Sequence, residues 1–500
     1  PPVPPLPPGF VRSPSQERPL IPPPPPPPPL PLQSLPRLHT PLASPVPQRS
    51  YSSTPGDPNG DKRYDVTAPA VFRPLLIPFA PINPLPSLGD PPVLTVSLPT
   101  QPSLSSAAQS VKTINNPSRQ VSWSKQVLDL VERIQISERR LYNDNLAPNL
   151  DPRLEVLVDQ AIQHILSLSQ IPGKPLYPYA AEAIYLRGTL AASGSFPAYI
   201  KRDLRAAFKD FETAARNSFD PAWFRIGRDY EGVNQIEKAR ECYERGVKIE
   251  EKNCLYVGIA QLLGQLGLSI NQRAAIPLLK HAADWSDVDT PQPAYVFGML
   301  LLGEYSHLEL PASTFAPYLP NSHAEPRMIE ARRYIEHAAY LNFAPAQCKA
   351  GWAYEYSKMG CPYDPLLSVQ YYSLASQQGE EEADMALSKW FLCGAEGCFD
   401  KDEHLAFTFA EKAARRGFPI AEFAMGYYHE VGVGCNIDVA VARKWYTRAS
   451  KRGNTDASER LRALNERNPS VLSREEHDSL AQNTLIRKRT LAREASKAAG

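Results

Sequence analysis

The sequence lacks an excess of charge of either sign, because its 500 residues carry 54 lysines and arginines against 53 aspartates and glutamates. A formal charge of +1 gives the whole chain no field that attracts nucleic acid, so we expect no nucleic-acid partner. Long apolar runs are also missing. A bilayer span needs about 18 or more apolar residues, and the best run, Tyr295–Leu302, is much shorter. We therefore expect no membrane-spanning segment.

Cysteine is scarce, and its spacing shows no paired framework. The number is odd, which favours reduced thiols in the cytoplasm over a set of disulfides. The seven cysteines are Cys242, Cys254, Cys348, Cys361, Cys393, Cys398 and Cys435.

Proline, by contrast, is abundant, and most of it lies near the start of the chain. The chain has 53 prolines, about twice the average usage of about 5%. Residues 1–120 show no helical or strand period and cannot bury a core, so we expect a disordered, Pro-rich, low-complexity region. The unbroken run Pro22–Pro29 should adopt a polyproline II helix. It is either a spacer or a docking strip for an SH3, WW, EVH1 or profilin-type aromatic groove.

Helical patterns begin near Val121. Ser122–Asn143 places apolar residues near one helical face, and Asp151–Ser169 repeats the pattern with a candidate N-cap at Asp151. We expect residues 121–170 to form a helical cap at the N-terminal end of a longer helical region. Residues 465–500 lose the pattern and carry the basic run Ile486–Arg489, which predicts a solvated polar tail.

Between the cap and the tail, residues 171–464 repeat themselves about every 35–40 residues. Each unit opens with alanine followed five positions later by glycine, so its first helix carries small residues where a second helix can come close. The pairs are Ala183/Gly188, Ala222/Gly227, Ala346/Gly351 and Ala421/Gly426, with one member kept at Gly258, Gly298 and Ala383.

The second half of each unit carries aromatic residues, then alanine, then a closing glycine. The last unit gives the template, with Gly432 and Gly434 at the turn and then Trp445, Tyr446, Ala449 and Gly453. One helical hairpin cannot bury its apolar face alone, but stacked hairpins can. We therefore predict an all-α fold, a right-handed α-solenoid of about seven helix-hairpin repeats. In it Trp445, Tyr371 and Phe409 are equivalent buried wedges between units.

Several residues invite a catalytic or metal-binding interpretation. His429-Glu430 is no zinc motif, since Val433 stands where the second histidine belongs. Gly432-Val433-Gly434 lacks the third glycine and the preceding strand of a phosphate loop. Cys435 has no evident histidine and carboxylate partners, so we predict a thiol without a catalytic role. Cys393 and Cys398 with His404 lack a fourth metal ligand.

One unit carries a long insertion, Glu304–Pro326. Insertions in repeat arrays project as loops that often bind partners. Phe315, Tyr318 and Leu319 are costly to leave in water, so they are candidate partner contacts unless the loop packs on its own chain.

The units resemble the Sel-one-like repeat, whose pattern is Ala, Leu-Gly, Tyr, Gly-x-Gly and then Trp-Tyr-x-x-Ala-Ala-x-x-Gly. The chain is also similar to the fungal chitin synthase activator (regulatory subunit) family, roughly from Ser122 to Leu464, and three longer stretches carry this similarity. They are Gly351–Gly379, Ala421–Gly434 and Ala383–Phe399, the last with Ala-Leu-Ser-Lys-Trp390-Phe, which the generic repeat does not require.

The resemblance implies a non-catalytic adaptor without metal or other cofactor. Its partner would be the chitin synthase catalytic subunit, which it would bind, activate and localise at septa and growth sites, partly through septin-associated scaffolds. The expected location is the cytoplasm, peripheral at the inner face of the plasma membrane and at the septum or bud neck. Some family members end in a prenylated cysteine box. This chain ends Ala498-Ala499-Gly500 without such a cysteine, so either it is truncated or it reaches the membrane only through its partner.

Two alternatives stay open. The first is an adaptor of the same shape in another complex, such as endoplasmic-reticulum-associated degradation. The second is a thiol hydrolase that uses Cys435 or Cys393 as its nucleophile.

Overall fold

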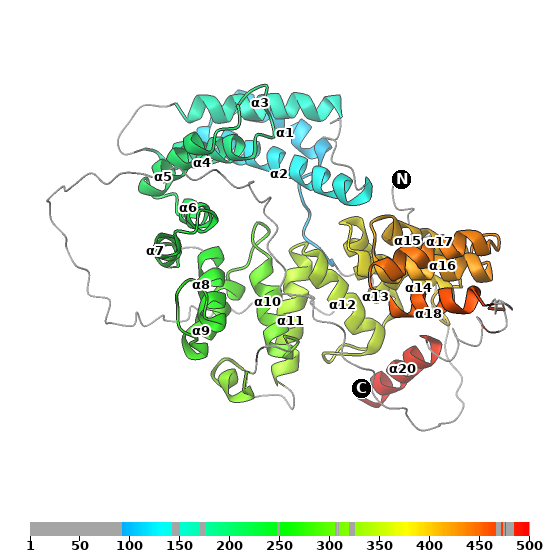
Figure 1. Cartoon of the computed structure of the whole chain (residues 1–500). Helices are drawn as coiled ribbons and strands as arrows, with labels where there is room; N and C mark the ends of the chain where they lie inside the picture. The colour runs from blue at the N-terminus through cyan, green and yellow to red at the C-terminus, as the bar shows by residue number, and fades with distance from the viewer. Residues whose placement is uncertain are drawn as a thin grey trace.

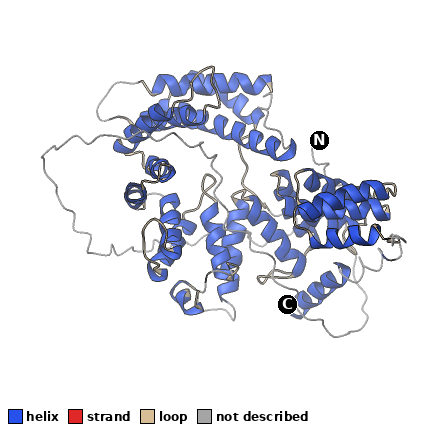
Figure 2. Ribbon diagram, in the orientation of Figure 1, coloured by secondary structure: helices blue, strands red, loops and turns tan. Residues whose placement is uncertain are grey.

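The computed structural model describes residues 93–142, 151–170, 176–247, 251–305, 308, 310–319, 326–466, 472, 473, 476 and 485–499. The proline run Pro22–Pro29 lies outside these residues. Throughout the described part the regular structure is helical and no strand occurs, so the predicted all-α solenoid is confirmed (Figure 2). In that same part no helix combines the length and the apolar character needed to cross a bilayer.

Three helices form the first packed unit: α1 (Gln101–Ile114), α2 (Pro117–Tyr142) and α3 (Pro152–Leu168). The prediction of disorder up to residue 120 is wrong for α1. Thr100 and Ser103 form a capping box at its start, which satisfies backbone donors that a helix leaves open. Leu104 and Val111 are seven residues apart, so both face α2 and α3 in one buried cluster.

Seven helical hairpins follow, each made of an A helix and a B helix packed side by side (Figure 1). The A and B helices are α4 (Pro178–Ser193) and α5 (Leu204–Arg216), α6 (Pro221–Gly232) and α7 (Ile236–Gly246), α8 (Glu251–Leu263) and α9 (Gln272–Asp284), α10 (Gln292–Leu302) and α11 (Pro326–Tyr340), α12 (Ala344–Tyr356) and α13 (Pro365–Gln377), α14 (Glu381–Cys393) and α15 (Glu403–Arg415), and α16 (Pro419–Val431) and α17 (Val439–Lys451). The helix α18 (Thr455–Leu464) packs on α17 and ends the array.

Local sequence sets where the B helices begin. Asp203, Asp364, Asp402 and Asp438 are N-caps whose carboxylates accept hydrogen bonds from the first backbone amides of their helices. Each B helix packs on its own A helix and on the A helix of the next hairpin. Buried alanines and aromatics therefore form a core that follows the array from one end to the other.

The array does not end as a free tail. Helix α20 (Arg487–Ala499) lies against α12 (Figure 1). Arg489 is buried, with only 4% of its surface exposed. The prediction of a solvated tail over residues 465–500 is therefore wrong for this helix. The contact joins residues more than a hundred positions apart, and the amphipathic pattern of a short basic helix does not reveal it.

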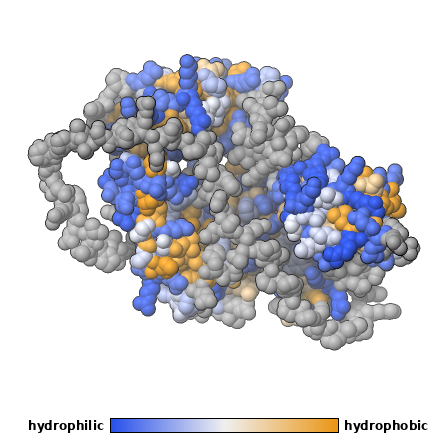
Figure 3. Space-filling view, in the orientation of Figure 1, coloured by the Kyte–Doolittle hydropathy of each residue, from blue (hydrophilic) through white to orange (hydrophobic). Residues whose placement is uncertain are grey.

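The chain also closes back on itself at its described start. The backbone N–H of Val96 donates to the carbonyl of Tyr340 at 2.9 Å. Arg133 on α2 donates to the carbonyl of Pro99 at 2.8 Å, so this extended segment links the first unit to the middle of the array. Figure 3 shows a mostly polar face with apolar residues gathered over α8 and α9.

Candidate functional site

The thiol that sequence analysis left without a partner lies beside a histidine. Cys435 Sγ is 3.6 Å from His429 Nδ1, because α16 ends at Val431 and the following turn brings residue 435 back. The sequence prediction missed this pair. Burial raises the pKa of the Cys435 thiol and lowers the pKa of His429. Both shifts favour the uncharged forms, the opposite of an activated thiolate–imidazolium pair.

A third catalytic group is not in place beside this pair. Asp438 and Glu411 both act on the pKa of His429. The Asp438 carboxylate caps α17 by accepting from the backbone N–H groups of Ala440 and Val441 at 2.9 and 3.0 Å, and Glu411 pairs with Arg415 at 2.9 Å. His429 instead packs edge-on against the Phe407 ring at 5.5 Å. The residues serve helix packing and capping, and nothing among them orients a base.

The structure does not support a metal site at Cys393, Cys398 and His404 either. Cys393 ends α14, and Cys398 lies in the turn that leads to α15. Within the described residues no three His, Cys, Asp or Glu side chains come together as ion ligands would.

The repeated glycines mark a contact that recurs along the array. Gly227, Gly351 and Gly426 each face a tyrosine on the B helix of the same hairpin: Tyr243, Tyr372 and Tyr446, in that order. A Cβ added at these glycines would lie only 2.5, 2.9 and 2.6 Å from the tyrosine ring. The two backbones approach this closely because the A-helix residue has no side chain.

Each tyrosine then bonds a glutamate one turn beyond its glycine. The hydroxyls of Tyr243, Tyr372 and Tyr446 donate to Glu231, Glu355 and Glu430 at 2.9, 2.9 and 2.8 Å. In three other hairpins the repeat glycine faces a residue other than tyrosine, and the glutamate is missing there as well. There Gly188, Gly258 and Gly298 face Phe211, Leu279 and Ile335, and the residues four positions later are Ala192, Leu262 and Leu302. A buried hydroxyl needs an acceptor, so the two changes occur together.

Two of these glutamates, Glu355 and Glu430, are buried and each pairs with an arginine. Glu430 accepts hydrogen bonds from Arg460 of α18 and from the backbone N–H of Leu472. Burial works against ionisation, but the bonds from Arg460, Leu472 and Tyr446 outweigh it and hold the pKa of Glu430 below its usual range. Glu355 receives Arg489 from α20 instead, with Nε and Nη2 at 3.0 and 2.8 Å.

A second repeated contact joins successive hairpins. Arg416 bonds the buried carboxylate of Asp384 and donates to the Gly379 carbonyl of the preceding hairpin at 2.6 Å. One unit later Arg452 lies 3.3 Å from Glu422 and donates to the Gly417 carbonyl at 3.0 Å. One unit earlier Gln378 donates to Gln347 at 2.8 Å in the same place. We call this contact the inter-repeat clamp.

Most of the remaining predicted repeat positions lie inside the helical packing; Trp445 is half-buried and Gly453 is exposed. Trp390 is fully buried and donates to the Ser368 hydroxyl at 3.0 Å. The prediction that Trp445 is a buried wedge is wrong. Its ring is half-buried, with the Arg448 guanidinium 4.4 Å from the ring centre, and the neighbouring Tyr446 is the buried wedge. Gly432, Gly434 and Gly453 adopt positive φ at helix ends and turns. The buried alanines are Ala183, Ala222, Ala346, Ala383, Ala421 and Ala449.

The described residues of the Glu304–Pro326 insertion pack on their own chain. The insertion contains the 3₁₀ turns η1 (Ala312–Thr314) and η2 (Ala316–Tyr318). Phe315 is fully buried against Phe297, and the Arg327 guanidinium lies 4.9 Å from its ring centre. The prediction that Phe315 contacts a partner is therefore wrong. Tyr318 and Leu319 are half-buried against the same core, which absorbs their apolar surface.

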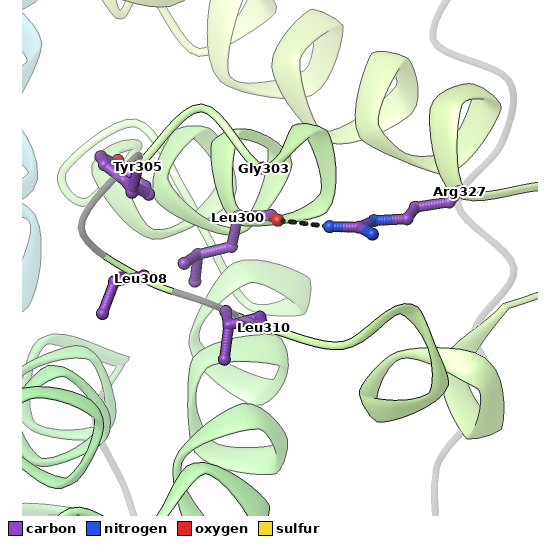
Figure 4. A pocket seen from close by; sticks show the side chains of 6 residues that line it. All are labelled: Leu300, Gly303, Tyr305, Leu308, Leu310 and Arg327. Atoms are coloured by element: carbon purple, nitrogen blue, oxygen red, sulfur yellow. Dashed lines mark hydrogen bonds between the residues drawn. The ribbon is translucent and has the colours of Figure 1, made fainter.

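A small recess lies beneath this insertion (Figure 4). Its walls are mostly apolar, and Arg327 donates to the carbonyl of Leu300 at 3.2 Å across one side. It offers about 20 Å³, which suits a single water molecule rather than a substrate. The lining residues are Leu300, Gly303, Tyr305, Leu308, Leu310 and Arg327. The described part of the chain is built from contacts between neighbouring helices.

Comparison with protein families agrees with this geometry. The model of the Sel1 repeat matches residues 344–380, 382–418 and 419–454. These three matches coincide with the hairpins α12/α13, α14/α15 and α16/α17, which carry the inter-repeat clamp.

Several curated relatives are similar over much of the chain. Chitin synthase regulatory factor 4 of Schizosaccharomyces pombe is 30% identical over 317 residues, 62% of this chain and 47% of that protein. Chitin synthase regulator SKT5 of Saccharomyces cerevisiae is 28% identical over 291 residues, 57% of this chain and 39% of that protein. The chain thus spans about half or less of these regulators. Activator of C kinase protein 1 of S. cerevisiae is 26% identical over 386 residues, 70% of this chain and 59% of that protein.

Among solved structures, the chain is similar to a Sel1 repeat protein from Oxalobacter formigenes. The two are 19% identical with a TM-score of 0.40, over 76% of this chain and 98% of that one.

Proposed function

We propose that this chain, which carries three matches to the Sel1 repeat and is similar to chitin synthase regulators, is a non-catalytic adaptor for a chitin synthase. It binds the catalytic subunit at the cytoplasmic side of the membrane, activates it and helps to hold it at septa and growth sites. The observation that carries the proposal is the similarity to chitin synthase regulatory factor 4 over 317 residues of this chain.

The described structure supports an adaptor in two ways. First, acids and tyrosines such as Glu430 and Tyr446 form hydrogen bonds with each other that hold neighbouring helices together. Second, the structure's best-placed thiol and imidazole, Cys435 and His429, favour their uncharged forms. Activation then follows from binding: an adaptor that prefers the active conformation of the synthase shifts the population toward it. A preference of about 2.7 kcal/mol corresponds to a hundredfold shift.

The test is a pull-down of the chitin synthase catalytic subunit from detergent-solubilised membranes with the full 500-residue chain as bait, and the same chain unfolded by heat as control. Chitin output of the same membranes is then measured with and without the folded chain. We expect capture by the folded chain alone and a rise in chitin output. Absence of both capture and increased output would refute the proposal.

A second candidate is an adaptor in a protein kinase C pathway. The relative named activator of C kinase protein 1 is matched over a larger share of both chains than the regulators are. The same pull-down, analysed by mass spectrometry, separates the two functions: a kinase-pathway protein in place of the synthase favours the second. Septin-associated scaffolds and proline-binding domains at Pro22–Pro29 remain proposed further partners, which the same experiment would detect.

A further inference from the structure

One buried arginine holds α20 on the array. The Arg489 guanidinium bonds Glu355 at 2.8 and 3.0 Å, lies 3.5 Å from the centre of the Trp390 ring and donates to the Lys389 carbonyl at 3.3 Å. Arg489 is therefore recognised by charge, by an aromatic face and by a backbone acceptor at once. We call the site formed by Glu355, Trp390 and the Lys389 carbonyl the arginine recess.

A comparison with the last hairpin shows why an arginine from outside the array can reach Glu355. In the last hairpin, Glu430 receives Arg460, which lies three residues after the buried Ala457 on the next A helix. The equivalent position after the buried Ala383 is Ala386, whose methyl group carries no donor toward Glu355. Glu355 therefore receives no arginine from the next A helix, and a helix from outside the array supplies one.

The contact of α20 with the array depends on few buried side chains. Apart from Arg489, only Ala492 is buried among the described side chains of this helix. Arg493 pairs with Glu396 at 2.9 Å, but both side chains are well exposed, and such pairs contribute little. The backbone N–H of Tyr363 donates to the Ser496 hydroxyl at 2.9 Å. Few buried contacts mark an element with low local stability.

We propose that the arginine recess is a docking site for an amphipathic helix of a partner protein, and that α20 occupies it within the same chain until such a helix displaces it. The contacting residues of α20 define the partner's chemistry. An arginine enters the recess, a small residue follows three positions later, and a polar residue follows at seven, as in Arg489, Ala492 and Ser496. A partner helix with this face makes the same contacts as α20. It binds more tightly than α20 if it buries further surface on the array.

This inference does not depend on the identity of the partner, so it stands apart from the chitin synthase proposal. The probe is a fluorescent peptide of residues 486–499, and its binding to the full-length chain is followed by fluorescence anisotropy. Arg489→Glu places a second carboxylate beside Glu355 and expels α20. Arg487→Glu reverses a charge at an exposed position of the same helix and leaves α20 docked.

We expect the peptide to bind the Arg489→Glu chain about tenfold or more tightly than the wild-type chain, because the internal competitor is gone. The Arg487→Glu chain should behave like the wild type. A peptide with alanine in place of Arg489 should lose binding to the Arg489→Glu chain. Equal binding to all three chains, or none to the Arg489→Glu chain, would overturn the proposal, as would a wild-type dimer that exchanges α20 between copies.

A measurement on the wild-type chain keeps the proposal testable if Arg489→Glu fails to fold. Hydrogen exchange of the α20 amides should be much faster than exchange of the α12 and α14 amides, since a displaceable helix opens without the rest of the array. Equal protection of α20 and α12 would show a permanently fixed helix and would refute displacement.

Discussion

The ring of Tyr446 lies directly against Gly426, and its hydroxyl reaches Glu430 one helical turn away at 2.8 Å. The glycine, the tyrosine and the glutamate depend on one another, because the close approach that glycine permits is what brings the hydroxyl to the carboxylate. The same three residue types make the same contact in two other hairpins, at Gly227 and Gly351.

Gly426→Ala should destabilise the protein. The added methyl group would lie 2.6 Å from the Tyr446 ring, and the helices must separate to admit it, at a cost of about 1–3 kcal/mol. Gly232→Ala is the matched control, since this helical glycine has nothing within 4 Å of an added Cβ, and alanine there should be neutral or stabilise by up to about 1 kcal/mol. Urea unfolding followed by circular dichroism measures both. Equal unfolding midpoints for the two variants would contradict the contact.

Arg416→Ala should be among the most damaging single changes. It leaves the buried Asp384 with Lys412 as its remaining cation, at 3.0 Å, and breaking one side of a buried ion pair costs about 3–5 kcal/mol. The neighbouring Arg415 is exposed and pairs only with Glu411 on its own helix, so Arg415→Ala should change stability by no more than about 0.5 kcal/mol. Similar melting temperatures for the two variants would rule out the clamp as a source of stability.

The hairpins were predictable from the sequence because their contacts are local. Ala421 and Gly426 recur at fixed spacing since small residues are required wherever two helices touch closely. Neighbouring aromatics were harder to separate. Trp445 and Tyr446 are about 100° apart on a helix, and only the position of the facing Gly426 decides which one is buried.

The contacts that sequence reasoning missed are those between distant segments. Nothing in the basic run that opens α20 marks Arg489 as the residue that pairs with Glu355, since its neighbours carry the same charge. Helix α1 was hidden because Leu104 and Val111 stand in a Ser- and Gln-rich stretch after many prolines. A usable signal did exist for these glutamates: one stands four residues after the repeat glycine in the hairpins where a B-helix tyrosine faces that glycine.

Asp129→Asn should raise stability near neutral pH but not in acid. Burial, assisted by Asp289 and Glu132 and opposed by Lys125, raises the pKa of Asp129 to about 6 from 3.8. Below about pH 4 the carboxyl is protonated in both folded and unfolded chains, so the substitution changes little. Between pH 4 and 6 the folded chain holds the proton more tightly, so stability falls as pH rises.

Above that range the wild type carries an unfavourable buried charge. One pKa unit is about 1.4 kcal/mol, and partial exposure reduces the effect, so we expect a gain of roughly 1–2 kcal/mol for Asp129→Asn at pH 7. Glu459→Gln, at an exposed position of α18 far along the chain from Asp129, serves as control and should show no such pH dependence. Urea unfolding at pH 4 and pH 7 measures the difference in the free energy of unfolding between variant and wild type. An equal gain in stability at both pH values would contradict the raised pKa of Asp129.

The thiols should react slowly at neutral pH. Burial raises the pKa of Cys361 to about 12 and that of Cys242 to about 11, and it raises the pKa of Cys435 as well, despite His429 at 3.6 Å. Since the thiolate is the reactive form, iodoacetamide at pH 7 should modify Cys435 no faster than an unperturbed thiol. Mass spectrometry after timed labelling measures each site.

His429→Ala then separates a packing histidine from a catalytic one. If His429 only packs against Phe407, its removal opens the turn around Cys435, and labelling there stays equal or becomes faster. If His429 served as a base, its removal would slow labelling, because the thiolate would lose the group that accepts its proton. Rapid labelling of Cys435 that depends on His429 would revive the thiol hydrolase and would end the interpretation of this turn as purely structural.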